Sequence, residues 1–186
     1  GGTIAVRRGA EVAYLEQEPD LDPESTARQC VEAALVAWRA AVQRHEAACA
    51  AVADGKDLER ALAEQADAEA EIERRGGWDR AHVVDRMLES LGVRDPEKRI
   101  GTMSGGEKRR VALARLLVAE PALAILDEPT NHLDVETIEW LENYLADTFK
   151  GALVLVTHDR YVLDRVVDRT LEIENGRVHS YDGGWD

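Results

Sequence analysis

The sequence predicts an α/β fold in which a parallel sheet flanked by helices is interrupted by an inserted antiparallel helical hairpin. In the second half of the chain, short apolar strands alternate with amphipathic helices, which is typical of a parallel sheet covered on both faces. Between residues 24 and 77, a helical apolar pattern stops at Asp54-Gly55-Lys56 and then resumes. We therefore expect strands in 1–23, the hairpin in 24–77 and the rest of the sheet in 78–186.

Composition limits the classes of function. The 186 residues include 23 Lys and Arg against 37 Asp and Glu, for a formal net charge of −14. This charge disfavours a nucleic-acid-binding surface, because phosphate neutralisation needs clustered cations. Cys30 and Cys49 are expected in one long helix, roughly 28 Å apart at 1.5 Å per residue, which rules out a disulfide bond between them. Without a long apolar run or a signal-peptide pattern, we expect a soluble, cytoplasmic protein of a reducing compartment.

The first region should hold two short strands, at 3–6 and 11–15, with Gly9 in the turn between them. Prolines and aspartates make 16–23 a loop, and this loop contains Gln17. The chain has no initiator methionine and begins like the exit from a turn. We therefore expect it to be a fragment of a longer protein.

The hairpin should begin with one helix from Pro23 up to Asp54, capped by Ser25 or Thr26. Its heptad seam is formed by Val31, Leu35, Trp38, Val42, His45, Cys49 and Val52. A second helix over 57–75 should fold back on the first. Its weaker stripe is formed by Leu58, Leu62, Gln65, Ala68 and Ile72. Within the seam, His45 could be a ligand or pH switch, but no second ligand stands at a suitable spacing, which favours a packing role.

The third region should begin with a helix over 79–91 and continue, after a loop at Asp95-Pro96, with a helix from Ser104 to about Val118. The elements expected next are a strand at 123–126, a helix at 135–146, a strand at 152–156, a helix at 161–167 and a strand at 170–173. A turn at Asn175-Gly176 should lead into a last strand at 177–180.

A possible anion site opens the helix that begins near Ser104. Free N–H groups at the helix start, the Ser104 hydroxyl and the absence of side chains at Gly105 and Gly106 would let an anion approach the backbone closely. A simple helix cap is the alternative.

Two carboxylates follow the apolar strand that begins at Leu123. Ligands of open α/β sheets collect at the carboxyl edge of such strands. Because adjacent strand residues point to opposite faces, Asp127 could hold Mg²⁺ while Glu128 orients or deprotonates a water. The next apolar strand ends in Thr157-His158-Asp159, and His158 could contact a transferring phosphate. Structural carboxylates and a structural histidine are the alternatives.

Taken in order, Gln17, SGGE at 104–107, LAILDEP at 123–129, NHLD at 131–134 and His158 resemble the motifs of the ATP-binding cassette (ABC) superfamily. The resemblance covers essentially the whole chain outside the hairpin and implies part of a nucleotide-binding domain that uses ATP and Mg²⁺. It implies a Q-loop glutamine near Mg²⁺ and the attacking water at Gln17, a Walker B metal ligand at Asp127 and a catalytic base at Glu128. It further implies a switch histidine at His158, a D-loop ending at Asp134, and a signature for ATP held by a facing domain at Ser104, Gly105, Gly106 and Glu107.

The form EPTNHLD, the following ETIEWLE and the YDGGW tail at 181–185 resemble the ABC-F proteins, particularly the Uup-like group. The hairpin occupies the place of the arm in their first cassette. The resemblance implies a second cassette or a dimer mate as partner, action at the ribosome, a DNA-related role in some members, and no membrane domain.

A phosphate-binding loop, Gly-x4-Gly-Lys-Ser/Thr, should precede Gln17, and the sequence contains none. We therefore expect a cassette truncated before the Q-loop that does not hydrolyse ATP alone. The alternatives are a chromosome-maintenance or DNA-repair ATPase, whose insertions are far longer, a transporter subunit, which normally lacks the hairpin, and an interaction module that uses the cassette as a rigid base.

Overall fold

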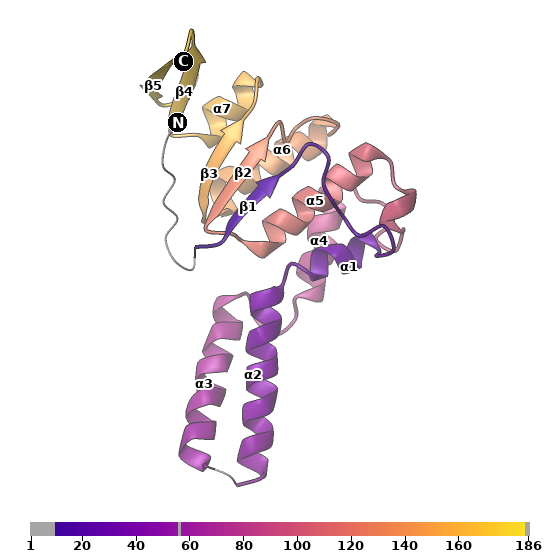
Figure 1. The fold of residues 1–186 in the computed structure, drawn as a ribbon, viewed down its shortest axis with the longest axis vertical. Coiled ribbons are helices and arrows are strands. Elements are labelled where there is room, and N and C mark those ends of the chain that lie inside the picture. Colours follow the sequence, from indigo (N-terminus) through magenta and orange to yellow (C-terminus); the bar gives the residue numbers. More distant parts are fainter. Residues whose placement is uncertain (1–9, 56, 185–186) are drawn as a thin grey trace.

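The computed structural model describes residues 10–55 and 57–184. The expected strand at 3–6, its turn at Gly9 and the end of the YDGGW tail lie outside the described residues. The sheet and the helices that pack on it form the body, and the helical hairpin is a distinct part of the same elongated molecule (Figure 1).

The body is built on a parallel sheet of three strands in the order β1-β2-β3. These are β1 (Val12–Leu15), β2 (Leu123–Asp127) and β3 (Ala152–Val156). Leu15 pairs with Leu126, and Asp127 pairs with Val156. The three strands therefore end at a common carboxyl edge, as the alternation of strands and helices predicts.

Helices cover one face of this sheet (Figure 1). The helices and helical turns of the body are α1 (Ala27–Glu32), α4 (Ala81–Ser90), η1 (Ile100–Thr102), α5 (Gly105–Ala119), α6 (Val135–Asn143), η2 (Tyr144–Thr148) and α7 (Arg160–Val166). Leu15 and Leu126 are buried in one core with Leu113 and Leu117 of α5 and Leu141 of α6.

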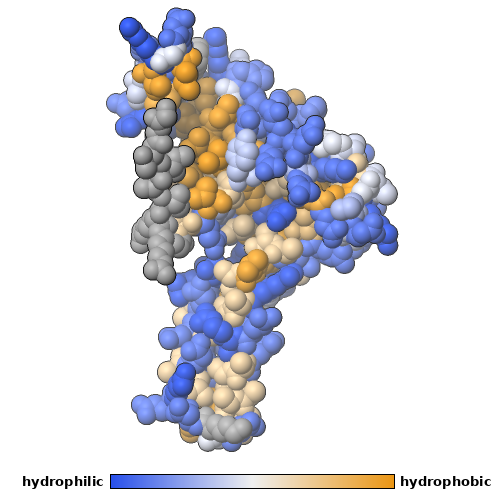
Figure 2. Space-filling model, in the orientation of Figure 1, coloured by the Kyte–Doolittle hydropathy of each residue, from blue (hydrophilic) through white to orange (hydrophobic). Residues whose placement is uncertain are grey.

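The opposite face of the sheet remains open, so the expectation that both faces are covered is wrong for the described residues. Val12, Tyr14, Val154 and Val156 alternate with the buried positions and stay about half exposed. Figure 2 shows apolar side chains gathered over the sheet. The apolar runs predicted burial on both sides, but α5 and α6 pack on only one.

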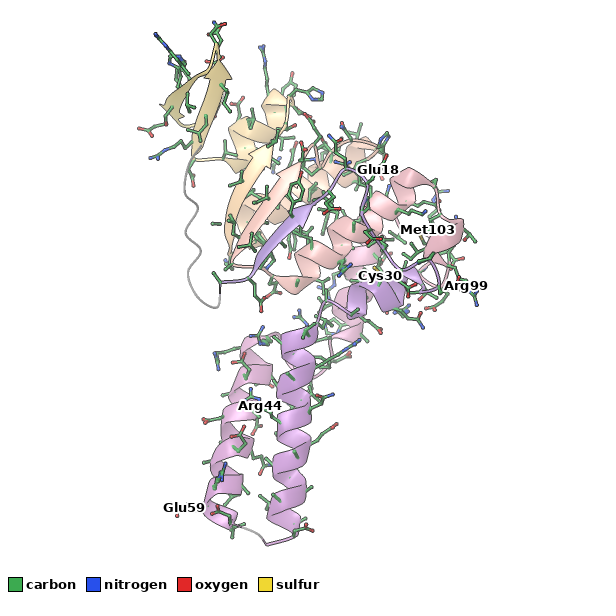
Figure 3. The ribbon with its side chains drawn as sticks, viewed as in Figure 1. Glu18, Cys30, Arg44, Glu59, Arg99 and Met103 are labelled. Atoms are coloured by element: carbon green, nitrogen blue, oxygen red, sulfur yellow. The ribbon has the colours of Figure 1, made fainter. Side chains whose placement is uncertain are left out.

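The expectation of a single long helix from Pro23 is also wrong, because the helix ends after α1 and a second helix begins as α2 (Val36–Ala53). Thr26 caps α1 in a capping box with Gln29. Val31 and Leu35 are buried in the core of the body instead of the hairpin seam. Tertiary packing therefore divides a continuous apolar pattern, and Cys30 lies in the body while Arg44 lies in the hairpin (Figure 3).

The antiparallel hairpin itself is confirmed, with α3 (Leu58–Arg74) lying alongside α2 (Figure 1). Its buried contacts come mainly from alanines, namely Ala41, Ala48, Ala61 and Ala68, together with the larger Ile72. Leu58 and Leu62 of the predicted stripe remain about half exposed. Alanines at the contact allow the two helices to approach closely, which leaves the larger side chains at the rim.

At the base of the hairpin, the Trp38 indole N–H donates to the Gly77 carbonyl at 2.9 Å. The His45 ring meets the Trp78 ring edge-on, with centroids 4.7 Å apart. Cys49 Sγ also lies 3.7 Å from His45 Nδ1, so the expectation that no second ligand type stands near His45 is wrong, while the ring contact with Trp78 fits a packing role.

The last two strands form a separate antiparallel ribbon, β4 (Arg169–Glu174) and β5 (Arg177–Asp182). Asn175 and Gly176 both have positive φ, at 49° and 75°, as a two-residue hairpin turn requires. The predicted turn is confirmed.

Candidate functional site

Three loops meet at the carboxyl edge of the sheet, and each carries a residue singled out from the sequence. Gln17 follows β1, Asp127 ends β2 and His158 follows β3. The fold thus brings together chain segments that are far apart in the sequence. Gln17 and His158 are exposed, and Asp127 is partly buried.

Glu128 lies just beyond the strand and not within it. Its φ of 49° is left-handed, a conformation that L-residues with a Cβ rarely adopt. Its N–H donates to the Val156 carbonyl at 2.7 Å, and its own carbonyl accepts from the Asn131 N–H at 3.2 Å. The alternation of strand residues therefore does not set the direction of the Glu128 side chain, which depends instead on this unusual backbone.

The Glu128 carboxylate is engaged by the loop after β3. Its Oε1 lies 2.8 Å from His158 Nδ1, and the Thr157 hydroxyl donates to its Oε2 at 3.4 Å. The hydrogen bond that the Glu128 carboxylate accepts is the main cause that raises the pKa of His158, and the carboxylate charge adds to it. Glu128 is largely covered while His158 is open to solvent, so the carboxylate is held and the imidazole is accessible.

The chemistry of the edge fits Mg²⁺ with Asp127 as a ligand. In the described part of the chain, no three His, Cys, Asp or Glu side chains gather into a metal cluster. Mg²⁺ is commonly held by one or two carboxylates together with waters and substrate phosphates, so a single aspartate is consistent with its usual coordination. The Gln17 backbone lies near this edge, where its carbonyl accepts from Arg109, and its side chain makes no hydrogen bond with another described residue.

Ser104 and Glu107 form the start of α5 as a capping box. The Glu107 N–H donates to Ser104 Oγ at 3.3 Å, and the Ser104 N–H donates to Glu107 Oε2 at 2.8 Å. The Lys98 ammonium donates to Glu107 Oε1 at 2.7 Å. This hydrogen bond, followed by those from Ser104, lowers the pKa of Glu107 to about 2. Ser104 therefore caps α5, as one of the two interpretations of its sequence expected. The contribution of Lys98 was not predicted from the sequence.

The two glycines of the signature leave the helix start accessible. A Cβ at Gly105 would meet nothing within 4 Å, and one at Gly106 would lie 3.5 Å from the Cβ of His132. Neither glycine is required by crowding inside the chain, so a ligand could approach here. Asp134 caps α6 by accepting from the Thr137 N–H at 2.9 Å, a bond that lowers its pKa.

Two arginines after the signature were missed by sequence reasoning. Arg109 is 8% exposed and donates to the carbonyls of Gln17, Asp127 and Glu128. Arg110 donates to the carbonyl of His132 at 3.0 Å. A signal for Arg109 was present, because it stands four residues before Leu113 on the buried stripe of α5, where a charge needs partners.

Comparisons with known proteins agree with this geometry. The family described as "ABC transporter" matches residues 3–131. The energy-dependent translational throttle protein EttA of Haemophilus influenzae is 41% identical over 185 residues, which are 99% of this chain and 33% of that protein. The Bacillus subtilis protein YfmR, described as an uncharacterized ABC transporter ATP-binding protein, is 37% identical over 100% of this chain and 29% of its own length. The chain therefore spans about a third of the curated relatives it matches.

Solved structures support the fold. The ATP-binding subunit of an ABC transporter aligns with a TM-score of 0.61 at 24% identity, covering 92% of this chain and 59% of that one. A dimeric ATP-binding cassette in a post-hydrolysis state with ADP and Pi aligns with a TM-score of 0.56 at 23% identity, covering 93% of this chain and 63% of that one. No helix in the described residues is both long and apolar enough to cross a membrane. The chain belongs to the ATP-binding cassette family.

Proposed function

We propose that this chain is part of an ABC-F ATPase and that the carboxyl edge of its sheet supplies the hydrolytic half of an ATP site. The observation that carries the proposal is the Glu128 carboxylate, held 2.8 Å from His158 beside Asp127 at the end of a parallel strand. A carboxylate in this place can accept a proton from a water that attacks a bound phosphate.

Each side chain then has a distinct task. Glu128 acts as the general base, and Thr157 and His158 fix its two oxygens. The exposed His158 ring can also contact the phosphate. Asp127 would hold Mg²⁺, which when bound neutralises charge on the transferring phosphoryl group. Gln17 would approach the metal and the attacking water from the loop after β1.

The site is divided. Ser104 and Glu107 bond to each other, and Glu107 also accepts from Lys98; these bonds do not link them to the Glu128 carboxylate. The signature would therefore contact a nucleotide held by another cassette. Because the sequence has no Gly-x4-Gly-Lys-Ser/Thr, the main holder of the β- and γ-phosphates must come from elsewhere. We propose that the chain alone does not hydrolyse ATP.

A chimera tests the assignment of the base. This chain replaces the matching third of Haemophilus influenzae EttA, to which it is 41% identical, and ATP turnover and ATP binding are measured. Glu128→Gln should lower turnover by about 10²- to 10⁴-fold, since it removes the general base, while ATP binding persists. Glu139→Gln, on the exposed surface of α6, is the matched control and should leave turnover unchanged. Equal turnover in the chimera and its Glu128→Gln variant would show that Glu128 is not the base.

We further propose that the whole protein acts on the ribosome in the cytoplasm. Support comes from the translational role in the printed name of its EttA relatives and from the α2–α3 hairpin, which projects from the body (Figure 1). With ATP, the two cassettes of the Glu128→Gln chimera should remain closed on the nucleotide, and the chimera should co-sediment with ribosomes. With ADP, it should not co-sediment. Co-sedimentation that is the same with either nucleotide would contradict an ATP-driven role.

A further inference from the structure

The Arg109 guanidinium lies between the two chain segments that carry the candidate reacting groups. Its Nη1 donates to the carbonyl of Gln17 at 3.1 Å, and its Nη2 donates to the carbonyls of Asp127 and Glu128, the latter at 3.0 Å. The first acceptor is 92 residues away in the sequence and the others are 18 and 19 residues away. One side chain thus joins the loop after β1 to the end of β2.

The chemistry of Arg109 is unusual for a buried charge. In the part of the chain that the structure describes, it forms no salt bridge, and its buried Nε has no hydrogen-bond partner. Buried arginines are ordinarily paired with carboxylates. Here the charge is offset by backbone carbonyls alone, so the position of the guanidinium is fixed by the backbone at the sheet edge.

Glu128 needs such a restraint. Its left-handed φ of 49° costs free energy for any residue with a Cβ, and such conformations persist where the surroundings hold them. Three bonds do so, namely its N–H to Val156, its carbonyl from Asn131 and its carbonyl from Arg109. Of these three bonds, only the one from Arg109 is charge-assisted. The Arg109 side chain also makes a second bond, to the carbonyl of Gln17.

We propose that Arg109 is a positioning residue, which fixes the Gln17 loop and the Glu128 backbone in one relative geometry. The proposal rests on the proposed function for its meaning, since Gln17 and Glu128 are the groups aimed at water and metal. The proposal gives Arg109 no contact with nucleotide or water, because its guanidinium donates to the backbone carbonyls of Gln17, Asp127 and Glu128. Because it stands five residues after Ser104 on α5, it also links the signature helix to the hydrolytic edge.

The neighbouring Arg110 serves a different segment. Its guanidinium donates to the carbonyls of Gly92 and His132, at 3.2 Å and 3.0 Å. The two arginines therefore tie α5 to separate loops, and the contact with Gln17 and Glu128 belongs to Arg109. Loss of Arg109 should accordingly loosen a defined set of groups, not the whole helix.

Nuclear magnetic resonance on the 186-residue chain without nucleotide tests the positioning role independently of ATP hydrolysis. The carbonyl carbons of Gln17 and Asp127 are read through the amides of Glu18 and Glu128. Arg109→Met keeps the length of the side chain and removes the donors, so both carbonyl signals should shift together towards values of less strongly bonded carbonyls. Arg109→Lys should restore part of the shift, and Lys108→Met on the preceding residue should leave both signals in place.

Amide exchange provides the second readout. In Arg109→Met, the amides of Glu128 and Asn131 should exchange about ten-fold faster or more, as expected when a charge-assisted hydrogen bond is lost. The interior amides of α4 should stay as in the wild-type chain. A uniform increase across β2, α4 and α5, or unchanged carbonyl signals, would mean that Arg109 only adds stability and would overturn the proposal.

A measurement on the wild-type chain keeps the test decisive if Arg109→Met does not fold. A guanidinium held by three carbonyls rotates slowly, so its Nη groups should give separate signals at low temperature. A freely rotating Arg109 would refute the proposed restraint.

Discussion

Replacing Glu128 by glycine and by alanine should reverse the usual order of their stabilities. Both variants lose the carboxylate and its contacts with His158 and Thr157, so those losses cancel between them. What remains is the φ of 49°. A Cβ in the left-handed region costs about 1–2 kcal/mol, against about 0.5–1 kcal/mol for the extra unfolded freedom of glycine. Glu128→Gly should therefore be more stable than Glu128→Ala by about 1 kcal/mol.

Urea unfolding followed by circular dichroism measures this difference. The control pair is Glu139→Gly and Glu139→Ala in α6, where the residue is exposed and helical. There glycine should be less stable than alanine by about 1 kcal/mol. If Glu128→Ala proves as stable as Glu128→Gly while Glu139→Gly is less stable than Glu139→Ala, the backbone at Glu128 is not left-handed. The strain that Arg109 is proposed to hold would then be absent.

Three further predictions concern the same body. Glu107→Gln removes an ion pair whose folded pKa lies at about 2 instead of 4.5. The unfolding free energy of the wild-type chain, measured by urea titration, should therefore fall as the pH drops from 4.5 towards 2. At pH 7 the variant should be less stable by about 1 kcal/mol after solvent screening, and it should lack the fall at low pH. Glu128 raises the pKa of His158, so this pKa should return towards its ordinary value in Glu128→Gln when the His158 proton resonances are followed against pH. In the wild-type chain, the ion pair between His158 and Glu128 should be fully formed below the ordinary histidine pKa and be lost as the pH rises through the raised pKa. Gly151→Ala would place a Cβ 2.2 Å from the Pro121 carbonyl oxygen and should lower the melting temperature, at a cost of about 1–3 kcal/mol.

The sequence was most informative where local chemistry and tertiary structure agree. Apolar strands ending in Asp127 and in Thr157-His158 predicted a shared carboxyl edge, and the register of the sheet confirms it. Asn175-Gly176 predicted a tight turn because both residues tolerate positive φ. These signals depend on a few adjacent residues and do not need knowledge of distant packing.

Long-range packing explains what was missed. The heptad pattern runs without interruption through Val31 and Leu35, but these two side chains are buried in the body, and α1 ends and α2 starts separately there. The direction of the Glu128 side chain likewise depends on a left-handed backbone, held by Val156 and by Arg109 from other elements. Neither could be read from spacing alone.

Phosphate release from the isolated chain, compared with the EttA chimera at the same Mg²⁺ and ATP concentrations, tests the central claim of a divided site most directly. We predict that the isolated chain releases no more phosphate than its Glu128→Gln variant, whereas the chimera turns over ATP and loses this activity with the same substitution. Clear turnover by the isolated chain above its Glu128→Gln control would contradict the claim that the edge around Asp127, Glu128 and His158 is only half of a site.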